Sequence, residues 1–529
     1  MRQSFVVHSP LRFLANLSFW QKSFLSVASG IFSILIFPKP ELSLLAWFCL
    51  VPLTISIYQE PKSGPAFFFG FLTGFVFFIG VCYWITDVLK SYGGLGWSGA
   101  FALFLLLVTY LSLFFALFSL LFSRISFFLP THCFYLSPFF WVTAEYLRGH
   151  LLTGFPWCLL GYALVDYVNL AQVSTVLGIY GMSFAAVIVN SLVASVFLTP
   201  AKVAIYRLAV VFLLLVGTAI FFSWRKEELS KAKQEVRIVQ TNISPEQSWN
   251  RESKVVLLNE LSDLSTWGNK DRKPFDEPKT IPIIVWPETP APFYFNHDPE
   301  FSQRMRNLAR ISARYLLFGF VDFKASNTRP NNQRDPYNSV ALLAPSGQAI
   351  SQYDKIHLVP FGEYVPYASF FFFIDKISTE AGNFKPGTRL VVPFVGGEGK
   401  LGTFVCYEAI FPDLVRRFAS EGANVFVNVT NDGWFGNSAA PFQHLNMARF
   451  RAIENQRYLL RAANTGISAI IDPYGRVKGK TSLNVRTVLD STFELENTLT
   501  LYTRYGDVFS WVCLGVTLLF VGFLARRSL

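Results

Sequence analysis

Long apolar runs on both sides of a charged segment constrain the fold of this 529-residue chain more than any other feature. A helix needs ~20 mostly apolar residues to cross a bilayer, so the sequence predicts a multi-pass α-helical membrane bundle of about eight spans. The first two runs are short, and the alternative for them is one hairpin that does not fully cross. The runs lie at residues 22–37, 42–58, 66–88, 97–122, 132–147, 172–197, 204–223 and 507–524.

The charged residues concentrate between these runs. Residues 224–505 hold 34 of the 46 Lys and Arg residues and 29 of the 35 Asp and Glu residues. Only 15% of the whole chain is charged, against ~25% in ordinary soluble proteins. The net charge of +11 is not gathered into a Lys/Arg cluster or a basic-aromatic stripe, so no nucleic-acid partner is expected.

The distribution of basic residues predicts the orientation of the bundle. With eight crossings and an internal N-terminus, nine basic residues fall on inside segments and three (Lys39, Lys90 and Arg148) on outside loops. This is the positive-inside asymmetry, and it predicts cytoplasmic termini with residues 224–505 on the opposite side. The first run lacks a small-x-small cleavage site and is interpreted as an anchor. The expected domains are residues 1–223 with about seven membrane helices, the extramembrane domain 224–505, and a last membrane helix with a short tail over 506–529.

The extramembrane domain shows a mixed strand and helix pattern, which is typical of a layered α/β fold. Residues 472–475 have turn chemistry between two strand-like runs. Helical patterns occur at 246–265, 299–315, 412–421 and 443–463. Strand-like runs occur at 236–240, 281–286, 316–323, 339–345, 391–395, 402–407, 423–429 and 467–471.

Cysteine usage singles out one thiol. Cys406 is the only cysteine of residues 224–505, and the other five lie in or beside apolar runs. In an oxidising compartment a cysteine without a disulfide partner is either buried and inert or kept for chemistry. A strand-like run ends at Cys406 and a helical pattern follows it. A side chain at such a turn is exposed to substrate, and this favours a nucleophile.

Three charged residues also stand at the ends of strand-like runs or in the loops after them. Glu288 follows a strand-like run, Lys355 begins a loop, and Glu363 follows a Pro-Phe-Gly turn. Each could be an ordinary solvated side chain. Together with Cys406 they supply a carboxylate, an ammonium and a thiol, the groups that cysteine-dependent acyl transfer requires.

The sequence does not predict a metal site or a nucleotide-binding site. The six His residues are scattered, so no metal site is expected. The motif Gly94-x-Gly96-x-x-Gly99 joins two membrane runs with no strand before it, so it does not predict a dinucleotide site. No cofactor is expected.

The order Glu, Lys, Cys resembles the nitrilase (carbon-nitrogen hydrolase) superfamily, and the local sequences resemble its membrane branch, the apolipoprotein N-acyltransferases. The resemblance covers nearly the whole chain. It is carried by residues Glu145–Gly149, Thr153–Trp157, Gly161, Tyr162, Gln240–Ile243, Trp286–Glu288, Lys355–Glu363, Cys406–Glu408, Asn431–Gly436, Gln443, His444, Met447–Arg449 and Arg461–Gly466.

This resemblance implies an α-β-β-α sandwich joined to a membrane bundle in the bacterial inner membrane, with the sandwich in the periplasm. It also implies transfer of an acyl chain from a phospholipid to the α-amine of a diacylglyceryl-modified apolipoprotein, by a monomer. On chemical grounds Glu288 is the general base for Cys406, and Lys355 with the Tyr407 backbone N–H stabilises the oxyanion. The remaining expected site residues are Glu363 and Glu408, which orient Lys355 or the amine, and the pocket residues Trp249, Tyr407 and Trp434.

Two other functions use the same residues differently. A membrane-tethered amidase or thioesterase would pass the acyl group to water, and a lipid-binding scaffold would not need Cys406. The run Phe370–Ile374 is interpreted either as an arm that dips into the bilayer or as a buried apolar segment.

Overall fold

The structure is a computed structural model. It describes residues 17–91, 96–224, 233–244, 250–266, 283–289, 294–326, 334–366 and 383–528. The chain divides into two compact units. The helical unit contains Met1–Thr86, Trp97–Lys226 and Tyr505–Leu529, and the α/β unit contains Asp87–Gly96 and Glu227–Arg504.

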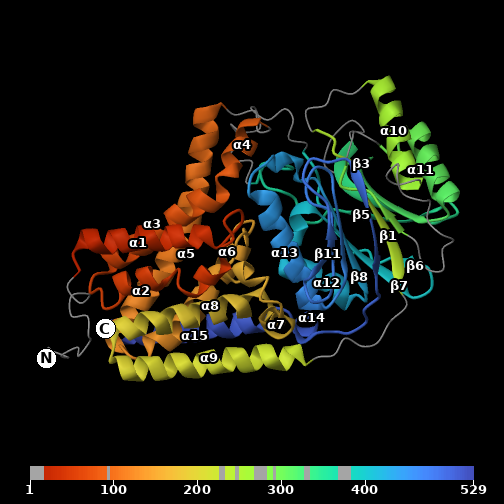
Figure 1. The fold of residues 1–529 in the computed structure, drawn as a ribbon. Helices are drawn as coiled ribbons and strands as arrows, with labels where there is room; N and C mark the ends of the chain where they lie inside the picture. The colour runs from red at the N-terminus through yellow and green to blue at the C-terminus, as the bar shows by residue number, and fades with distance from the viewer. Residues whose placement is uncertain are drawn as a thin grey trace. The chain divides into compact units, whose positions relative to one another are not determined.

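The helical unit consists of apolar helices joined by short connections (Figure 1). Among the described residues, five helices are long and apolar enough to cross a membrane: Ser63–Cys82, Trp97–Phe128, Ser174–Leu198, Ala201–Ser223 and Val508–Arg526. The region 42–58 forms two short helices instead of one. The helices of this unit are α1 (Phe19–Leu35), η2 (Ser43–Trp47), α2 (Val51–Ile57), α3 (Ser63–Cys82), α5 (Trp97–Phe128), α6 (Cys133–His150), η3 (Leu160–Leu164), α7 (Val168–Ala171), α8 (Ser174–Leu198), α9 (Ala201–Ser223) and α15 (Val508–Ser528), and α4 (Trp84–Ser91) crosses the boundary between the units.

Two buried charged side chains on α6 fix the segment that follows this helix. Glu145 Oε1 accepts a hydrogen bond from the Leu160 N–H at 2.8 Å. Arg148 Nη1 donates to the carbonyl of Trp157 at 2.8 Å. Buried charges are costly in an apolar bundle unless they are hydrogen-bonded. The segment between α6 and η3 is not helical, so the Trp157 carbonyl and the N–H of Leu160, the first residue of η3, lack helical hydrogen-bond partners. Glu145 and Arg148 supply those partners.

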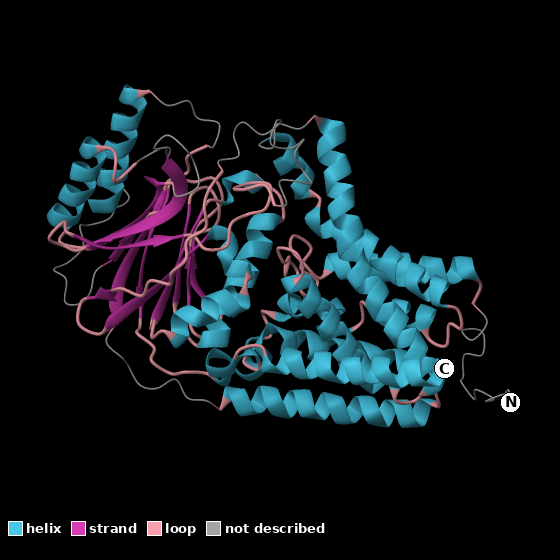
Figure 2. Ribbon diagram, turned by 180° about the vertical axis from the view of Figure 1, so that it is seen from behind, coloured by secondary structure: helices cyan, strands magenta, loops and turns pink. Residues whose placement is uncertain are grey.

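The α/β unit is built on two six-stranded sheets, which Figure 2 shows as two stacked layers between helices. Helices α10 (Arg251–Thr266) and α11 (Pro299–Ser312) pack on the first sheet, and α12 (Pro412–Ser420) and α13 (Ala440–Asn455) on the second. The first sheet has the order β12 (Thr487–Phe493), β1 (Gln234–Gln240), β2 (Ile283–Val285), β3 (Tyr315–Ala325), β4 (Arg334–Leu343), β5 (Ala349–Asp354). The second has the order β11 (Val477–Lys480), β10 (Ala469–Ile471), β9 (Leu459–Ala463), β8 (Val425–Thr430), β7 (Gly399–Val405), β6 (Phe394–Val395), and α14 (Leu501–Tyr505) ends the unit.

Alternation along the strands explains the layering. On β2, Ile283 and Val285 face the core between the sheets, whereas Ile284 packs in the cluster under α10 and α11. Because successive side chains of a strand point to opposite faces, a strand that is apolar on both faces must be covered on both. The sequence expectation of a helical membrane bundle plus an α-β-β-α sandwich is confirmed.

Some sequence boundaries are wrong. The helical pattern predicted over 443–463 ends at Asn455, where Gln456 adopts a left-handed conformation with φ 49°. Residues 459–463 form β9, which pairs in parallel with β8. A strand buried on both faces lacks the two-residue alternation, so its sequence does not separate it from a helix. Strands β5 and β12 were not predicted, and the run at 391–395 contributes only Phe394 and Val395 to β6.

Candidate active site

Three of the predicted site residues directly follow or closely follow strand ends. Lys355 comes directly after β5, Cys406 directly after β7, and Glu288 shortly after β2. Strands β2 and β3 are parallel, and β5 runs in the same direction because two antiparallel pairings separate it from β3. The carboxyl ends of β2 and β5 therefore share one edge of the first sheet.

A backbone contact joins this edge to the second sheet. Glu288 Oε2 accepts a hydrogen bond from the N–H of Asn431 at 2.8 Å, and Asn431 follows β8, the parallel neighbour of β7. Gly319 on β3 leaves room for the backbone that carries this carboxylate. A Cβ at Gly319 would lie 2.8 Å from the Cα of Glu288.

Lys355 lies between two carboxylates and is only 1% exposed. Its Nζ is 2.9 Å from Glu363 and 3.5 Å from Glu288. Burial disfavours the ammonium form, but the charges of Glu363 and Glu288 outweigh burial and raise the pKa of Lys355 above its ordinary value. The side chain is therefore a fixed cation at neutral pH.

Asn338 on β4 sets the separation of these two carboxylates, and the sequence analysis did not identify it. Its Nδ2 donates to Glu288 Oε1 at 2.7 Å and to Glu363 Oε1 at 2.8 Å. The backbone N–H of Lys355 donates to the carbonyl of Asn338 at 2.8 Å. A buried amide at the start of an apolar strand-like run was the signal that could have indicated it.

Cys406 has a left-handed backbone conformation with φ 48°, which is uncommon for a residue with a side chain. It is the first residue of η4 (Cys406–Ile410) and is 6% exposed. Burial raises the pKa of the thiol, Glu288 raises it further, and Lys355 lowers it. The resting group is therefore a protonated thiol that needs a base.

Glu408 is fully buried and ties the Cys406 turn to the loop that follows Lys355. Its Oε2 accepts from the Val405 N–H at 2.7 Å. Its Oε1 accepts from the N–H groups of Ile356 at 2.7 Å and His357 at 3.0 Å, and from the Tyr353 hydroxyl at 2.8 Å. Glu408 thus binds backbone amides, whereas Glu363 contacts the Lys355 ammonium itself.

The expected aromatic residues are less closely joined to this centre. Tyr407 follows Cys406 in the chain, and its ring centroid lies 5.2 Å from that of Phe411. Trp434 belongs to η5 (Asp432–Phe435), which follows β8, and it is 41% exposed. Trp249 and the run Phe370–Ile374 lie outside the described residues.

The sequence matches two known families. The family described as Carbon-nitrogen hydrolase matches residues 235–500, and the Apolipoprotein N-acyltransferase N-terminal domain matches residues 29–192. A crystal structure of Saccharomyces cerevisiae Nit3, a nitrilase-superfamily member, is 19% identical with a TM-score of 0.37, over 51% of this chain and 92% of that one.

Relatives that match most of the chain show the family. The apolipoprotein N-acyltransferase of Brucella melitensis is 31% identical, over 89% of this chain and 90% of its own length. That of Geobacter metallireducens is 36% identical over 523 residues, which is 95% of each chain. The chain belongs to the apolipoprotein N-acyltransferase family.

In this acyltransferase the arrangement contains chemical groups that can carry out acyl transfer. The negative charge of Glu288 raises the pKa of the buried Cys406 thiol, and the positive charge of Lys355 lowers it. A base, a nucleophile and an oxyanion donor are the groups that acyl transfer needs.

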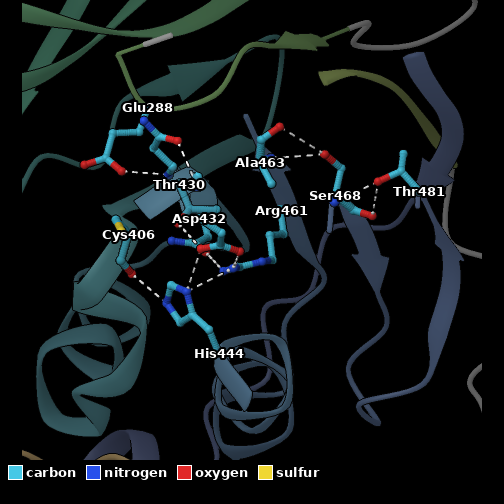
Figure 3. Close-up of polar contacts among 12 residues, drawn as sticks. Glu288, Cys406, Thr430, Asp432, His444, Arg461, Ala463, Ser468 and Thr481 are labelled. Carbon is cyan, nitrogen blue, oxygen red and sulfur yellow. Dashed lines mark hydrogen bonds and ion pairs between the residues drawn. The ribbon is translucent and has the colours of Figure 1, made fainter. Parts of the chain in front are cut away.

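A second buried polar cluster of the acyltransferase lies behind Cys406. Figure 3 shows Asp432, His444 and Arg461, which come from η5, α13 and β9. In the sequence, these residues stand out only as part of the family resemblance. Within the described part of the chain, no group of three or more His, Cys, Asp or Glu residues could hold a metal ion.

Proposed function

We propose that this acyltransferase moves a fatty acyl chain from a membrane phospholipid, through a thioester on Cys406, to the N-terminal α-amine of S-diacylglyceryl-cysteine in an apolipoprotein. The observation that carries the proposal is the placement of buried Lys355 between Glu288 and Glu363, with Lys355 and Glu288 both acting on the Cys406 thiol. Family membership supplies the class of reaction.

In the first half-reaction Glu288 takes the proton of the Cys406 thiol, and the sulfur attacks the ester carbonyl carbon of the phospholipid. The Lys355 ammonium and the backbone N–H of Tyr407 stabilise the tetrahedral oxyanion. The ester C–O bond then breaks, the lysophospholipid alkoxide takes the proton from Glu288, and the acyl group remains on sulfur.

In the second half-reaction the neutral α-amine of the acceptor attacks the thioester carbonyl, with the same two donors at the oxyanion. The C–S bond breaks as the amide forms. Glu288 takes the amine proton and returns it to the thiolate. The base therefore serves both steps, and the resting thiol is restored.

The other site residues have supporting roles in this proposal. Glu363 holds the Lys355 ammonium, and Glu408 holds the backbone on both sides of the site. Tyr407, Trp434 and Trp249 line the acyl or head-group pocket. The proposed working unit is a monomer.

The charge asymmetry of the sequence supports the proposed orientation, and family membership supports a bacterial membrane. The protein lies in the bacterial inner membrane with cytoplasmic termini, residues 224–505 face the periplasm, and 1–223 and 506–529 anchor them. A single cysteine introduced by Ile311→Cys on α11, where the native residue is 77% exposed, should react with a membrane-impermeant maleimide in spheroplasts. Lys62→Cys, on an inside segment, is the matched control. If only the Lys62→Cys variant were labelled, the orientation would be the opposite of the one proposed.

The decisive test is intact-mass spectrometry after incubation with phospholipid micelles. We expect a hydroxylamine-sensitive acyl adduct on the wild type and none on Cys406→Ala. A synthetic peptide that begins with diacylglyceryl-cysteine should then clear the adduct and gain the acyl mass.

Two outcomes would replace the proposal. If the adduct clears equally fast in buffer and the peptide gains no mass, the protein is a tethered hydrolase of the same superfamily. If the wild type forms no adduct with phospholipid, Cys406 does not take its acyl group from this donor.

A further inference from the structure

The ring of His444 lies between the nucleophile's backbone and the buried ion pair behind it (Figure 3). Its Nε2 is 3.1 Å from the carbonyl oxygen of Cys406. Its Nδ1 is 3.0 Å from Asp432 Oδ1 and 3.1 Å from Arg461 Nη2. The imidazole side chain is only 1% exposed, so the surrounding side chains and not solvent determine which nitrogen carries the proton.

The partners of His444 place a proton on Nε2. A carbonyl oxygen only accepts hydrogen bonds, so the nitrogen that faces Cys406 must donate. This holds for the neutral ring and for the imidazolium. Burial lowers the pKa of His444, and the positive charge of Arg461 lowers it further against the opposing effect of Asp432. The ring at neutral pH is therefore the uncharged Nε2–H form.

The ion pair behind the ring holds it in place. Arg461 Nη2 lies 2.8 Å from Asp432 Oδ2, and the Thr430 hydroxyl donates to Asp432 Oδ1 at 3.0 Å. The chain leaves room for this carboxylate at Gly466, where a Cβ would lie 2.4 Å from Asp432 Oδ2. A buried carboxylate with these partners is a rigid support for the imidazole.

The carbonyl that His444 holds belongs to the same peptide plane as the N–H of Tyr407. A trans peptide is planar, and its C=O and N–H point in opposite directions, so fixing one fixes the other. The peptide between Phe404 and Val405, on the other side of the Cys406 turn, is fixed as well, because the Val405 N–H donates to Glu408. Between these two anchors Cys406 keeps its left-handed conformation, which persists only where the surroundings enforce it.

We propose that His444 is a positioning residue whose Nε2–H holds the Cys406 carbonyl and thereby aims the Tyr407 N–H at the oxyanion. This inference rests on the proposed acyl transfer, because it requires a tetrahedral intermediate at Cys406. His444 neither accepts nor delivers a proton in the reaction. Its hydrogen bond also polarises the peptide, which strengthens the Tyr407 N–H as a donor.

Two isosteric variants separate the two nitrogens of the ring. In His444→Gln the side-chain amide nitrogen replaces Nε2 and keeps the donor to Cys406. In His444→Asn the side-chain amide takes the place of Nδ1, so it stays beside Asp432 and Arg461 but does not reach Cys406. We expect His444→Asn to slow thioester formation about 100-fold at unchanged KM, and His444→Gln to retain most of the wild-type rate.

Two further measurements distinguish positioning from a merely structural or acid–base role. The titratable and charged groups that face His444 are Asp432 on η5, Arg461 on β9 and Cys406 in η4. The pH profile of His444→Gln should keep its wild-type shape between pH 5.5 and 8. Alkylation of Cys406 by iodoacetamide forms no oxyanion, so His444→Asn should slow it far less than it slows acylation.

Equal acylation rates for His444→Gln and His444→Asn, or a pH limb that disappears in His444→Gln, would overturn the inference. If His444→Asn melts below the assay temperature, His444→Met replaces it as a variant of similar bulk without a donor. If the wild type forms no thioester with phospholipid, the proposed acyl donor is wrong. The same comparison is then made with p-nitrophenyl acetate, whose reaction with a thiol passes through the same kind of oxyanion.

Discussion

Glu288 accepts a hydrogen bond from the backbone N–H of Asn431 at 2.8 Å. The carboxylate comes from the end of β2 in one sheet, and the N–H comes from the chain that leaves β8 in the other. The candidate base is therefore oriented by the packing of two sheets, and its geometry depends on both.

The opposed electrostatic effects on Cys406 give the first prediction. Burial raises the pKa of the thiol, Glu288 raises it further and Lys355 lowers it. At pH 9, Glu288→Gln should therefore speed alkylation of Cys406 by iodoacetamide about tenfold, although it abolishes acyl transfer, and Lys355→Met should slow alkylation about tenfold. The rates are read by mass spectrometry of the Cys406 peptide. A change in the same direction in both variants would contradict this account.

Asn338 gives the second prediction, because it holds two carboxylates through one amide nitrogen. Asn338→Asp places a third carboxylate beside Glu288 and Glu363, and like charges raise the pKa of a carboxyl group. The acid limb of kcat/KM against pH should move up by about one pH unit. Asn338→Ser, which removes the amide without adding a charge, should lower kcat and leave the limb in place. Identical profiles for the two variants would argue against charge repulsion.

Gly319 gives the third prediction. The Cβ of an alanine there would lie 2.6 Å from the N of Thr289 and 2.8 Å from the Cα of Glu288. Because backbone must move, Gly319→Ala should displace the base and lower the acylation rate about 100-fold. Gly479→Ala is the matched control, because its Cβ would meet only the Leu489 Cδ1 atom at 3.3 Å. If Gly319→Ala is acylated at the wild-type rate, the position of Glu288 does not depend on this close backbone contact.

The fourth prediction concerns stability at acid pH. Burial alone would raise the pKa of Asp432, but the opposing groups, Arg461 first among them, outweigh burial and lower the pKa to about 2. An unfolded Asp has a pKa of ~3.9, so the stabilisation is complete above that pH and is lost as the pH falls toward about 2. Its size at neutral pH is about 2 kcal/mol.

Thermal unfolding between pH 7 and 2, followed by tryptophan fluorescence, tests this. Asp432→Asn should lower the melting temperature at neutral pH and flatten its fall in acid. Asp413→Asn removes a half-exposed helix ion pair with Arg416, and such pairs contribute little. The fourth prediction fails if the Asp432 and Asp413 variants behave alike.

The predictions from sequence were most accurate where one local signal was sufficient. Apolar runs of spanning length indicated the five long helices, because a helix that faces lipid must be apolar over its whole length. Strand-like runs before Glu288 and Cys406 indicated their positions after strand ends.

Contacts between residues far apart in the sequence determine the features that local sequence patterns did not predict. Residues 459–463 form a strand because β8 pairs with them, and Asn338 matters because Glu288 and Glu363, far apart in the sequence, meet at its amide. The orientation of the Cys406 carbonyl depends on His444, which lies on α13, 38 residues along the chain. The order of the amino acids is enough to identify which chemical groups are present and which segments are apolar. Only packing determined their separations, because hydrogen-bond geometry is fixed by strands and helices that come together after the chain has folded.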